Sequence, residues 1–281
     1  MEKLVPKLRF PEFESKWVEF KLGNLFEMKS GNFVPANEID SIPNSNLYPC
    51  YGGNGLRGYT KTFTHNGKYN IIGRQGALCG NVNLVEGSFH ATEHAVVVNN
   101  NENHDNDFLF YILNNLKLNR LAIGQAQPGL SITILNSVKF FSTSLPEQQK
   151  IASFLTSVDE RLTLLAQQKE KLELYKKGVM QQIFSQKLRF KDENGKDYVD
   201  WEEKTLNQLV SNPISDGPHS TPKFYKTGIP FLSVNNIIDN KINFENVRYI
   251  SLDDHNVFSK KCKPKKHDIL MGKAASVGKI A

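Results

Sequence analysis

Gly53, Gly55 and Gly58 stand in the spacing G-x-G-x-x-G within the stretch YGGNGLRGY. In dinucleotide-binding enzymes this spacing cradles a pyrophosphate, provided that a buried strand precedes the loop and a helix follows it. Here YTKTFTHNGKYN follows, which is rich in β-branched, aromatic and turn residues and has no helical period. We therefore interpret these glycines, with Gly73 and Gly80, as turn formers in loops whose backbone can approach another polyanion closely.

A second motif that could carry chemistry is HATEH, from His90 to His94, which has the H-x-x-E-H spacing of some zinc proteases. That spacing binds zinc only on a helix, and here it runs into AVVVNN, which indicates a strand. On a strand the two histidines would lie about 13 Å apart. We therefore predict no metal site, and we interpret these residues as polar groups at the end of a strand. No Walker loop and no nucleophile motif occurs in the sequence, so we predict no catalytic residue.

The element most clearly indicated is a long helix over 144–186. Ser144 and Glu147 form a capping-box signature, and Pro146 falls in the first turn, where its missing N–H costs nothing. Apolar residues then recur in alternating steps of four and three, as in a coiled coil spanning roughly 57 Å. These seam residues are Ile151, Leu155, Val158, Leu162, Leu165, Leu172, Val179 and Ile183. Either the seam packs on the chain's own domains or it pairs with an equivalent helix.

The sequence on either side of this helix repeats itself. KLRF occurs at 7–10 and again at 187–190, and each copy is followed by a Trp and then by a Leu pair. The stretch NIIGRQGALCGNV (70–82) is echoed by DILMGKAASVGKIA (268–281) with one residue deleted. Three features in the same order predict an internal repeat. Because the second copy stops early, we expect a chain truncated inside its second domain.

Both copies are predicted to be mixed and β-rich. KYNIIG and HAVVVNN in the first copy, and IPFLSVNNI and HDILMG in the second, have the composition of strands, and GKIA would end the chain inside a strand. Residues 107–123 have the apolar spacing of a helix. The predicted fold is therefore α+β: a first domain over 1–143, a coiled-coil spacer helix over 144–186, and an incomplete second domain over 187–281.

The composition is that of a soluble, folded protein, with 39% hydrophobic and 23% charged residues. The net charge is +6, and residues 187–281 hold most of the excess, with 16 Lys/Arg against 12 Asp/Glu. This surplus fits nucleic-acid binding without establishing it. The densest basic run, KKCKPKK (260–266), is either a phosphate-contacting patch or a solvated loop. Three cysteines without close spacing favour a reducing cytoplasm, and no apolar run is long enough for a membrane helix.

Several motifs together resemble the specificity subunit of type I restriction–modification systems. They are KLRFPEF, YGGNGLRGY, ATEHAVV, QPGLS, LPEQQKIASFL, DGPHSTPKFY and GIPFLSVNNI. The resemblance implies a non-enzymatic reader of double-stranded DNA, with two target recognition domains for a bipartite, gapped site. It also implies two modification subunits that methylate adenine with S-adenosylmethionine, and restriction subunits that use ATP and Mg. No cofactor is expected in this chain itself. The missing second spacer helix puts an intramolecular helix pair in doubt and suggests self-association through the spacer.

DNA contacts call for Lys and Arg on phosphates or guanine, Asn and Gln on adenine, and Thr methyls or aromatics on thymine. The candidates are Asn54, Arg57, Tyr59, Lys61, Arg74, Gln75, Thr92, His94, Gln125, Gln127, His219, Ser220, Thr221, Lys223 and Lys273. For each one, a loop or capping role away from DNA stays open. Two other functions also stay open: a coiled-coil scaffold without DNA reading, and, with less support, a self-sufficient DNA-modifying enzyme.

Overall fold

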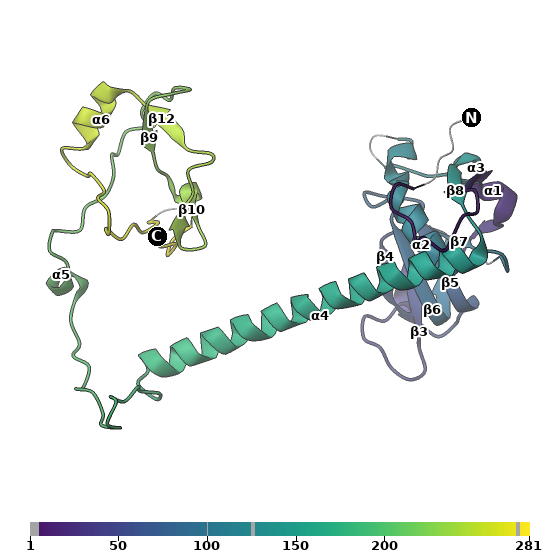
Figure 1. Ribbon diagram of the computed structural model, residues 1–281, viewed down its shortest axis with the longest axis horizontal. Coiled ribbons are helices and arrows are strands. Elements are labelled where there is room, and N and C mark those ends of the chain that lie inside the picture. Colours follow the sequence, from purple (N-terminus) through teal and green to yellow (C-terminus); the bar gives the residue numbers. More distant parts are fainter. Residues whose placement is uncertain (1–5, 100, 125–126, 274–275) are drawn as a thin grey trace. The chain divides into compact units, whose positions relative to one another are not determined.

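The structure is a computed structural model that describes residues 6–99, 101–124, 127–273 and 276–281. The described chain divides into two compact units, the first ending at Leu188 and the second beginning at Arg189 (Figure 1). The first unit holds a mixed sheet and the long helix α4, which agrees with the predicted α+β class. The division into two recognition domains and a spacer stays a prediction.

A six-stranded sheet forms the centre of the first unit, in the order β2-β7-β5-β6-β3-β4. All neighbours are antiparallel except β3 and β6, which run parallel. A second, two-stranded sheet pairs β1 with β8. The strands are β1 (Val18–Lys21), β2 (Met28–Ser30), β3 (Tyr48–Gly52), β4 (Gly55–Thr60), β5 (His65–Gly73), β6 (Val82–Ala91), β7 (Ala95–Val98) and β8 (Lys139–Ser142).

The core lies on both faces of the six-stranded sheet because successive strand residues point to opposite sides. Ile71 and Val97 pack with Phe89 on one face, whereas Ile72 and Val96 belong to the larger cluster on the other. That larger cluster includes residues from the short helices that cover it. They are α1 (Leu22–Leu25), α2 (Asn106–Asn115), the 3₁₀ turn η2 (Leu118–Leu121) and α3 (Ile132–Ser137).

The single helix expected over 107–123 is wrong in its second half. Helix α2 ends at Asn115, and Lys117 adopts a left-handed backbone conformation with φ of 49° before the 3₁₀ turn begins. This break lets Leu113 and Leu118 both turn into the core, where each is fully buried. The apolar residues keep a helical spacing through 107–123, although the backbone changes direction between α2 and the 3₁₀ turn.

The long helix is confirmed as α4 (Leu145–Phe184), 40 residues long. Figure 1 shows it extending away from the sheet of the first unit. Its first turns are anchored, since Glu147, Gln148 and Ala152 are buried. Every residue from 157 to 177 is exposed, so the middle of the predicted seam is uncovered. Among the described residues, no helix is long and apolar enough to cross a membrane.

The capping box predicted at the start of α4 is not formed. Ser144 occupies the N-cap position but makes no side-chain cap hydrogen bond. The Glu147 carboxylate instead accepts hydrogen bonds from Arg9, Trp17 and Thr143. The Glu147 carboxylate, which the capping-box signature assigned to the backbone N–H at the helix start, thus binds the charged Arg9 guanidinium, a stronger hydrogen-bond donor.

The second unit has short elements: α5 (Leu206–Leu209), β9 (Ile229–Phe231), the 3₁₀ turn η3 (Val234–Asn236), β10 (Ile237–Ile238), β11 (Lys241–Ile242), β12 (Arg248–Ile250) and α6 (Leu252–Phe258). IPFLSVNNI is thus two strands with a turn between them. The strand expected at HDILMG is wrong, as is the strand expected at GKIA. Met271 and Ile280 make only an isolated bridge.

Local geometry confirms the internal repeat at the glycine-rich segment. Gly73 N–H donates to Asn81 and Gly80 N–H donates back to Gly73, at 2.9 and 2.7 Å. In the second unit, Gly272 and Gly278 make the matching pair of bonds at 2.8 and 3.0 Å. Gly80 and Gly278 share a φ of 89°. Two stretches with different residues between their glycines are therefore closed by matching backbone bonds.

A further match was not predicted from the sequence. In the first unit Pro49 of β3 pairs with Tyr59 of β4, and Tyr59 also forms an isolated bridge to Asp40. In the second unit β9 pairs Pro230 with Tyr249 of β12, and Tyr249 likewise forms a bridge, to Tyr225. Helices α1 and α5 also coincide with the two Leu pairs of the repeat. The repeat therefore extends to strand pairing.

Candidate nucleic-acid interface

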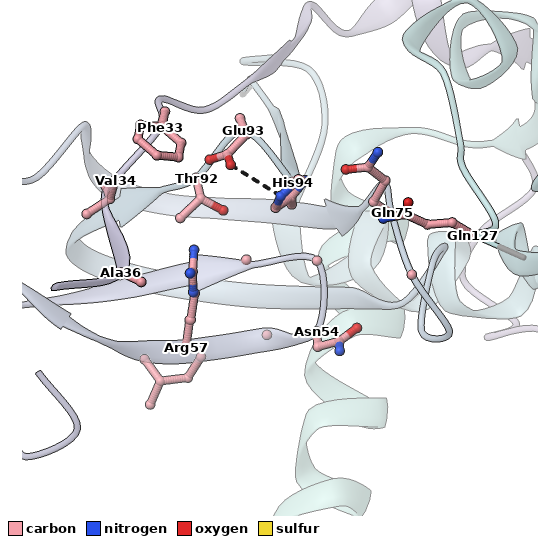
Figure 2. Close-up of a pocket in the computed structure, with 15 residues that line it drawn as sticks. Phe33, Val34, Ala36, Asn54, Arg57, Gln75, Thr92, Glu93, His94 and Gln127 are labelled. Atoms are coloured by element: carbon pink, nitrogen blue, oxygen red, sulfur yellow. Dashed lines mark ion pairs between the residues drawn. The ribbon is translucent and has the colours of Figure 1, made fainter. Parts of the chain in front are cut away.

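A cavity of about 540 Å³ opens at one edge of the first unit (Figure 2). It is lined by the segment after β2, the β3–β4 turn with the start of β4, the segment after β5, the turn between β6 and β7, and Gln127. Six of the sequence-predicted residues line it, namely Asn54, Arg57, Gln75, Thr92, His94 and Gln127. Residues that lie as far apart as 54 and 127 in the chain are thus brought to one site.

Glycines let these loops approach each other at backbone distance. A Cβ on Gly73 would lie 1.9 Å from the carbonyl oxygen of Gly53, and one on Gly53 would lie 2.9 Å from that of Gln75. Gly55 turns the chain with a φ of 89°. The loop after β3 leads into strand β4 and not into a helix, as predicted. These glycines therefore shape the cavity wall by close packing and by positive φ.

Backbone hydrogen bonds fix the turn between β6 and β7. Thr92 N–H donates to the Tyr51 carbonyl at 2.8 Å, and Ala95 N–H donates to the Thr92 carbonyl at 2.9 Å. Arg74 N–H donates to the His94 carbonyl at 2.9 Å. The turn is thus tied to β3 and to the segment after β5. Side chains on such a braced turn can be presented to a ligand without a large loss of conformational freedom.

The two histidines of HATEH lie in different environments. His90 is the last residue but one of β6 and is buried, and its ring nitrogens lie 3.0 Å from Thr62 Oγ1 and 3.3 Å from the Asn32 carbonyl oxygen. His94 is half-exposed, and its Nε2 lies 3.2 Å from Glu93 Oε1. The interpretation of this stretch as polar groups presented at a strand end is therefore wrong for His90, whose side chain is buried and contacts other residues of the chain. Within the described ranges, no group of three His, Cys, Asp or Glu side chains could hold a metal ion.

Three described residues of the predicted set in the first copy, Arg74, Tyr59 and Lys61, are not among those lining the cavity. Arg74 donates from Nη1 to Ser30 Oγ at 2.6 Å. Tyr59 is half-buried within β4, and Lys61 is exposed just beyond that strand. Gln125 lies outside the described residues. The predicted set is thus divided between the cavity and its surroundings.

In the second unit two of the five predicted residues converge on one carboxylate. Lys273 Nζ lies 2.6 Å from Asp216 Oδ2, and His219 Nε2 lies 3.4 Å from it. Lys261, from the basic run KKCKPKK, adds a contact of 2.5 Å to Asp216 Oδ1. Hydrogen bonds from Lys261 and Lys273 hold the pKa of Asp216 well below its ordinary value. Ser220, Thr221 and Lys223 are exposed near this cluster in sequence.

Sequence reasoning missed Asp216 in the second unit and Glu93 in the first. One signal could have found Asp216. The cation after the repeated glycine is Arg74 in the first copy and Lys273 in the second, and each contacts the residue before another glycine, Ser30 or Asp216. Aligning the copies over this pair would have identified Asp216 as the counterpart of Ser30.

The fold and the cavity define an α+β module carried on a long helix. The family model described as the type I restriction modification DNA specificity domain matches residues 14–174. The chain is 43% identical over 153 residues to the type I restriction enzyme EcoprrI specificity subunit of Escherichia coli. It is 33% identical over 94 residues to the MjaVIII specificity subunit of Methanocaldococcus jannaschii. The chain belongs to the type I restriction modification DNA specificity family.

The matches cover parts of the chains compared. The E. coli match covers 54% of this chain and 38% of that subunit, and the M. jannaschii match covers 32% and 22%. The chain therefore spans less than half the length of these curated relatives. A solved structure of the type I restriction–modification S subunit from M. genitalium aligns over 99% of this chain and 71% of its own, with a TM-score of 0.59 and 20% identity. That similarity establishes the fold.

Proposed function

We propose that this chain is the DNA-reading specificity subunit of a type I restriction–modification complex and that the first unit reads one half of a bipartite, gapped site. The observation that carries the proposal is the cavity, which gathers Asn54, Arg57, Gln75 and Gln127 at one edge of the sheet. Arg suits guanine, whereas Asn and Gln suit adenine. Membership in the specificity family supports the same role.

The second unit would contribute the other half-site. Lys261 and Lys273 converge there on Asp216, and an ammonium held by one carboxylate keeps further N–H donors for a phosphate, a contact that positions a protein on the duplex without reading sequence. The exposed Ser220, Thr221 and Lys223 are the further candidates there. The charge excess of residues 187–281 favours this role.

Catalysis would belong to partner subunits. We expect two modification subunits that use S-adenosylmethionine to methylate adenine, and restriction subunits that use ATP and Mg, all acting on DNA in the cytoplasm. The exposed stripe of α4 is the surface that we assign to helix pairing, either with a second copy of this chain or with another subunit. Val158, Leu162, Leu165 and Leu172 are 41–58% exposed there, and apolar side chains in a heptad stripe are covered when helices pair.

The test is to co-express the full chain with the modification subunit of its system and to map adenine methylation across the host genome. A gapped motif with two short specific halves supports the proposal. Arg57→Ala should weaken specific binding of the assembled complex by about 1–3 kcal/mol if the guanidinium contacts a base. Arg161→Ala on α4 removes the same charge outside the cavity and should leave specificity unchanged.

A coiled-coil scaffold without DNA reading is the competing function, and salt dependence separates the two. Affinity that falls steeply as salt rises indicates phosphate contacts, because counterions are released on binding. Absence of both methylation and DNA binding in a complex that assembles would refute DNA reading and support the scaffold.

A further inference from the structure

Two buried polar atoms at the cavity have no partner within the protein. Thr92 Oγ1 and Glu93 Oε2 belong to adjacent residues that both line the cavity. In the described part of the chain only two other buried side-chain atoms, in Asn70 and His104, lack a hydrogen-bond partner. Folded proteins rarely leave such groups unpaired, and an unpaired group inside a binding site suggests a partner supplied by the ligand.

Both side chains belong to the braced turn between β6 and β7. Thr92 is fully buried, and a Cβ on Gly52 would lie 3.5 Å from its Oγ1. Glu93 uses its other oxygen, Oε1, for the His94 contact at 3.2 Å, and its side chain is 32% exposed. One carboxylate oxygen is therefore occupied and the other is left as an acceptor.

The chemistry of these groups selects one kind of base edge. An ionised carboxylate oxygen only accepts hydrogen bonds, so it matches an amino group and repels a carbonyl. In the major groove, adenine presents its N6 amino group and cytosine its N4 amino group, whereas thymine and guanine present the carbonyl oxygens O4 and O6. Figure 2 shows the Arg57 guanidinium reaching toward Thr92 and Glu93 from β4, so that a donor faces the same space. Acceptor and donor together form a reading surface.

We propose that Glu93, supported by Thr92, is a specificity-determining residue whose free carboxylate oxygen accepts a hydrogen bond from the exocyclic amino group of one adenine or cytosine. The inference rests on the proposed function, since it requires that this cavity meets DNA. It adds a residue that discriminates between bases, because an amino group is accepted and a carbonyl is rejected.

The test compares Glu93→Gln with Glu86→Gln. Glu86 is an exposed residue of strand β6 that does not line the cavity, so both variants remove one negative charge from neighbouring parts of the chain. Wild type and both variants, each with the modification subunit, select binding sites from a pool of random duplexes. A glutamine can both donate and accept, so Glu93→Gln should lose about 5- to 150-fold discrimination at one base position. Glu86→Gln should keep the wild-type consensus.

Base analogues then distinguish adenine from cytosine. Purine lacks the N6 amino group and 2-pyrimidinone lacks the N4 amino group, and each replaces the base at the relaxed position. Wild type should lose affinity on the analogue of its own base, while Glu93→Gln should lose less, because an amide oxygen accepts from the amino group more weakly than a carboxylate does. Thr92→Val should also weaken discrimination without lowering the unfolding temperature, because the hydroxyl it removes has no partner in the protein.

The outcomes separate the two proposals. If wild type selects a consensus but Glu93→Gln keeps it, or loses as much affinity on the analogue as wild type does, the role of Glu93 is overturned and DNA reading stands. If wild type selects no consensus, both proposals fail. A Thr92→Val variant with a lowered unfolding temperature and unchanged discrimination would assign that hydroxyl to packing alone, which overturns its supporting role.

Discussion

Replacing Glu147 with glutamine removes the charge from a side chain that is fully buried at the start of α4. Its carboxylate accepts four hydrogen bonds: two at 2.6 Å from Arg9, one at 3.3 Å from Trp17 and one at 2.5 Å from Thr143. This network joins the N-terminal segment to the helix that carries the module. Glutamine keeps the shape but leaves the Arg9 guanidinium, whose side chain is only 13% exposed, without a counter-charge.

The expected loss follows from that burial. Breaking a buried ion pair by removing one partner costs about 3–5 kcal/mol, and the oxygen kept by glutamine places this variant near the lower end, at about 3 kcal/mol. For a unit of this size, that loss corresponds to a fall in unfolding temperature of about 6–12 °C. Glu173→Gln is the control, because Glu173 forms only an exposed pair with Lys169 at 3.8 Å. Such surface pairs contribute about 0.3–0.5 kcal/mol.

The assay is thermal unfolding at pH 7 and at a series of lower pH values. Burial raises the pKa of Glu147, but hydrogen bonds from Arg9, Thr143 and Trp17 outweigh it and leave the pKa below its ordinary value. The unfolded state then binds the proton first, so the stabilisation is complete above about pH 4.5 and is lost as the pH falls below that value. Equal shifts for Glu147→Gln and Glu173→Gln would refute this reasoning, as would a difference that does not shrink in acid.

Two matched pairs of variants test other parts of the fold. Gly73→Ala places a Cβ 1.9 Å from a backbone oxygen and should cost about 3 kcal/mol in urea unfolding, whereas Gly178→Ala meets nothing within 4 Å and should stabilise α4 by up to about 1 kcal/mol. Effects of the same sign would contradict the packing argument. Leu162→Asp should weaken self-association about tenfold or more in sedimentation, because a 58%-exposed leucine of the stripe is replaced by a charge, whereas Gln167→Asp should not. A wild-type chain that sediments as a monomer at high concentration would exclude pairing with a second copy.

The helix was predictable to within two residues at each end, because its apolar spacing and first-turn proline are local properties. Strands were less predictable, since a strand exists only where a partner pairs with it. HDILMG has strand composition, yet among the described residues Met271 forms only an isolated bridge. The end of α2 depends on the left-handed backbone conformation of Lys117. Lysine is a good helix former, so its residue type does not predict this break.

The candidate site could be predicted in its residue types but not in its assembly. Polar residues in glycine-rich loops suggested Asn54, Arg57 and Gln75, and the structure brings these three to one cavity. Glu93 was missed because the candidates for DNA contacts were Lys, Arg, Asn, Gln, Thr and aromatic residues, so that Thr92 and His94 of the same motif were chosen and the carboxylate between them was not. Its present importance depends on a carboxylate oxygen that is buried without a partner, which only the tertiary contacts reveal.

The repeat indicates how two copies of one scaffold could recognise different sequences. Both units close the glycine segment with matching backbone bonds and pair a proline with a tyrosine across two antiparallel strands, so these parts of the backbone are alike. What differs is the chemistry at one equivalent contact: Arg74 with a neutral Ser30 in the first unit, and Lys273 with an ionised Asp216 in the second. A serine leaves the arginine's charge uncompensated, whereas the aspartate shares its charge among Lys261, Lys273 and His219. Exchanging Ser30 for Asp should therefore weaken the attraction of the first unit for a phosphate while preserving its fold, because the loop is held by backbone bonds that neither side chain makes.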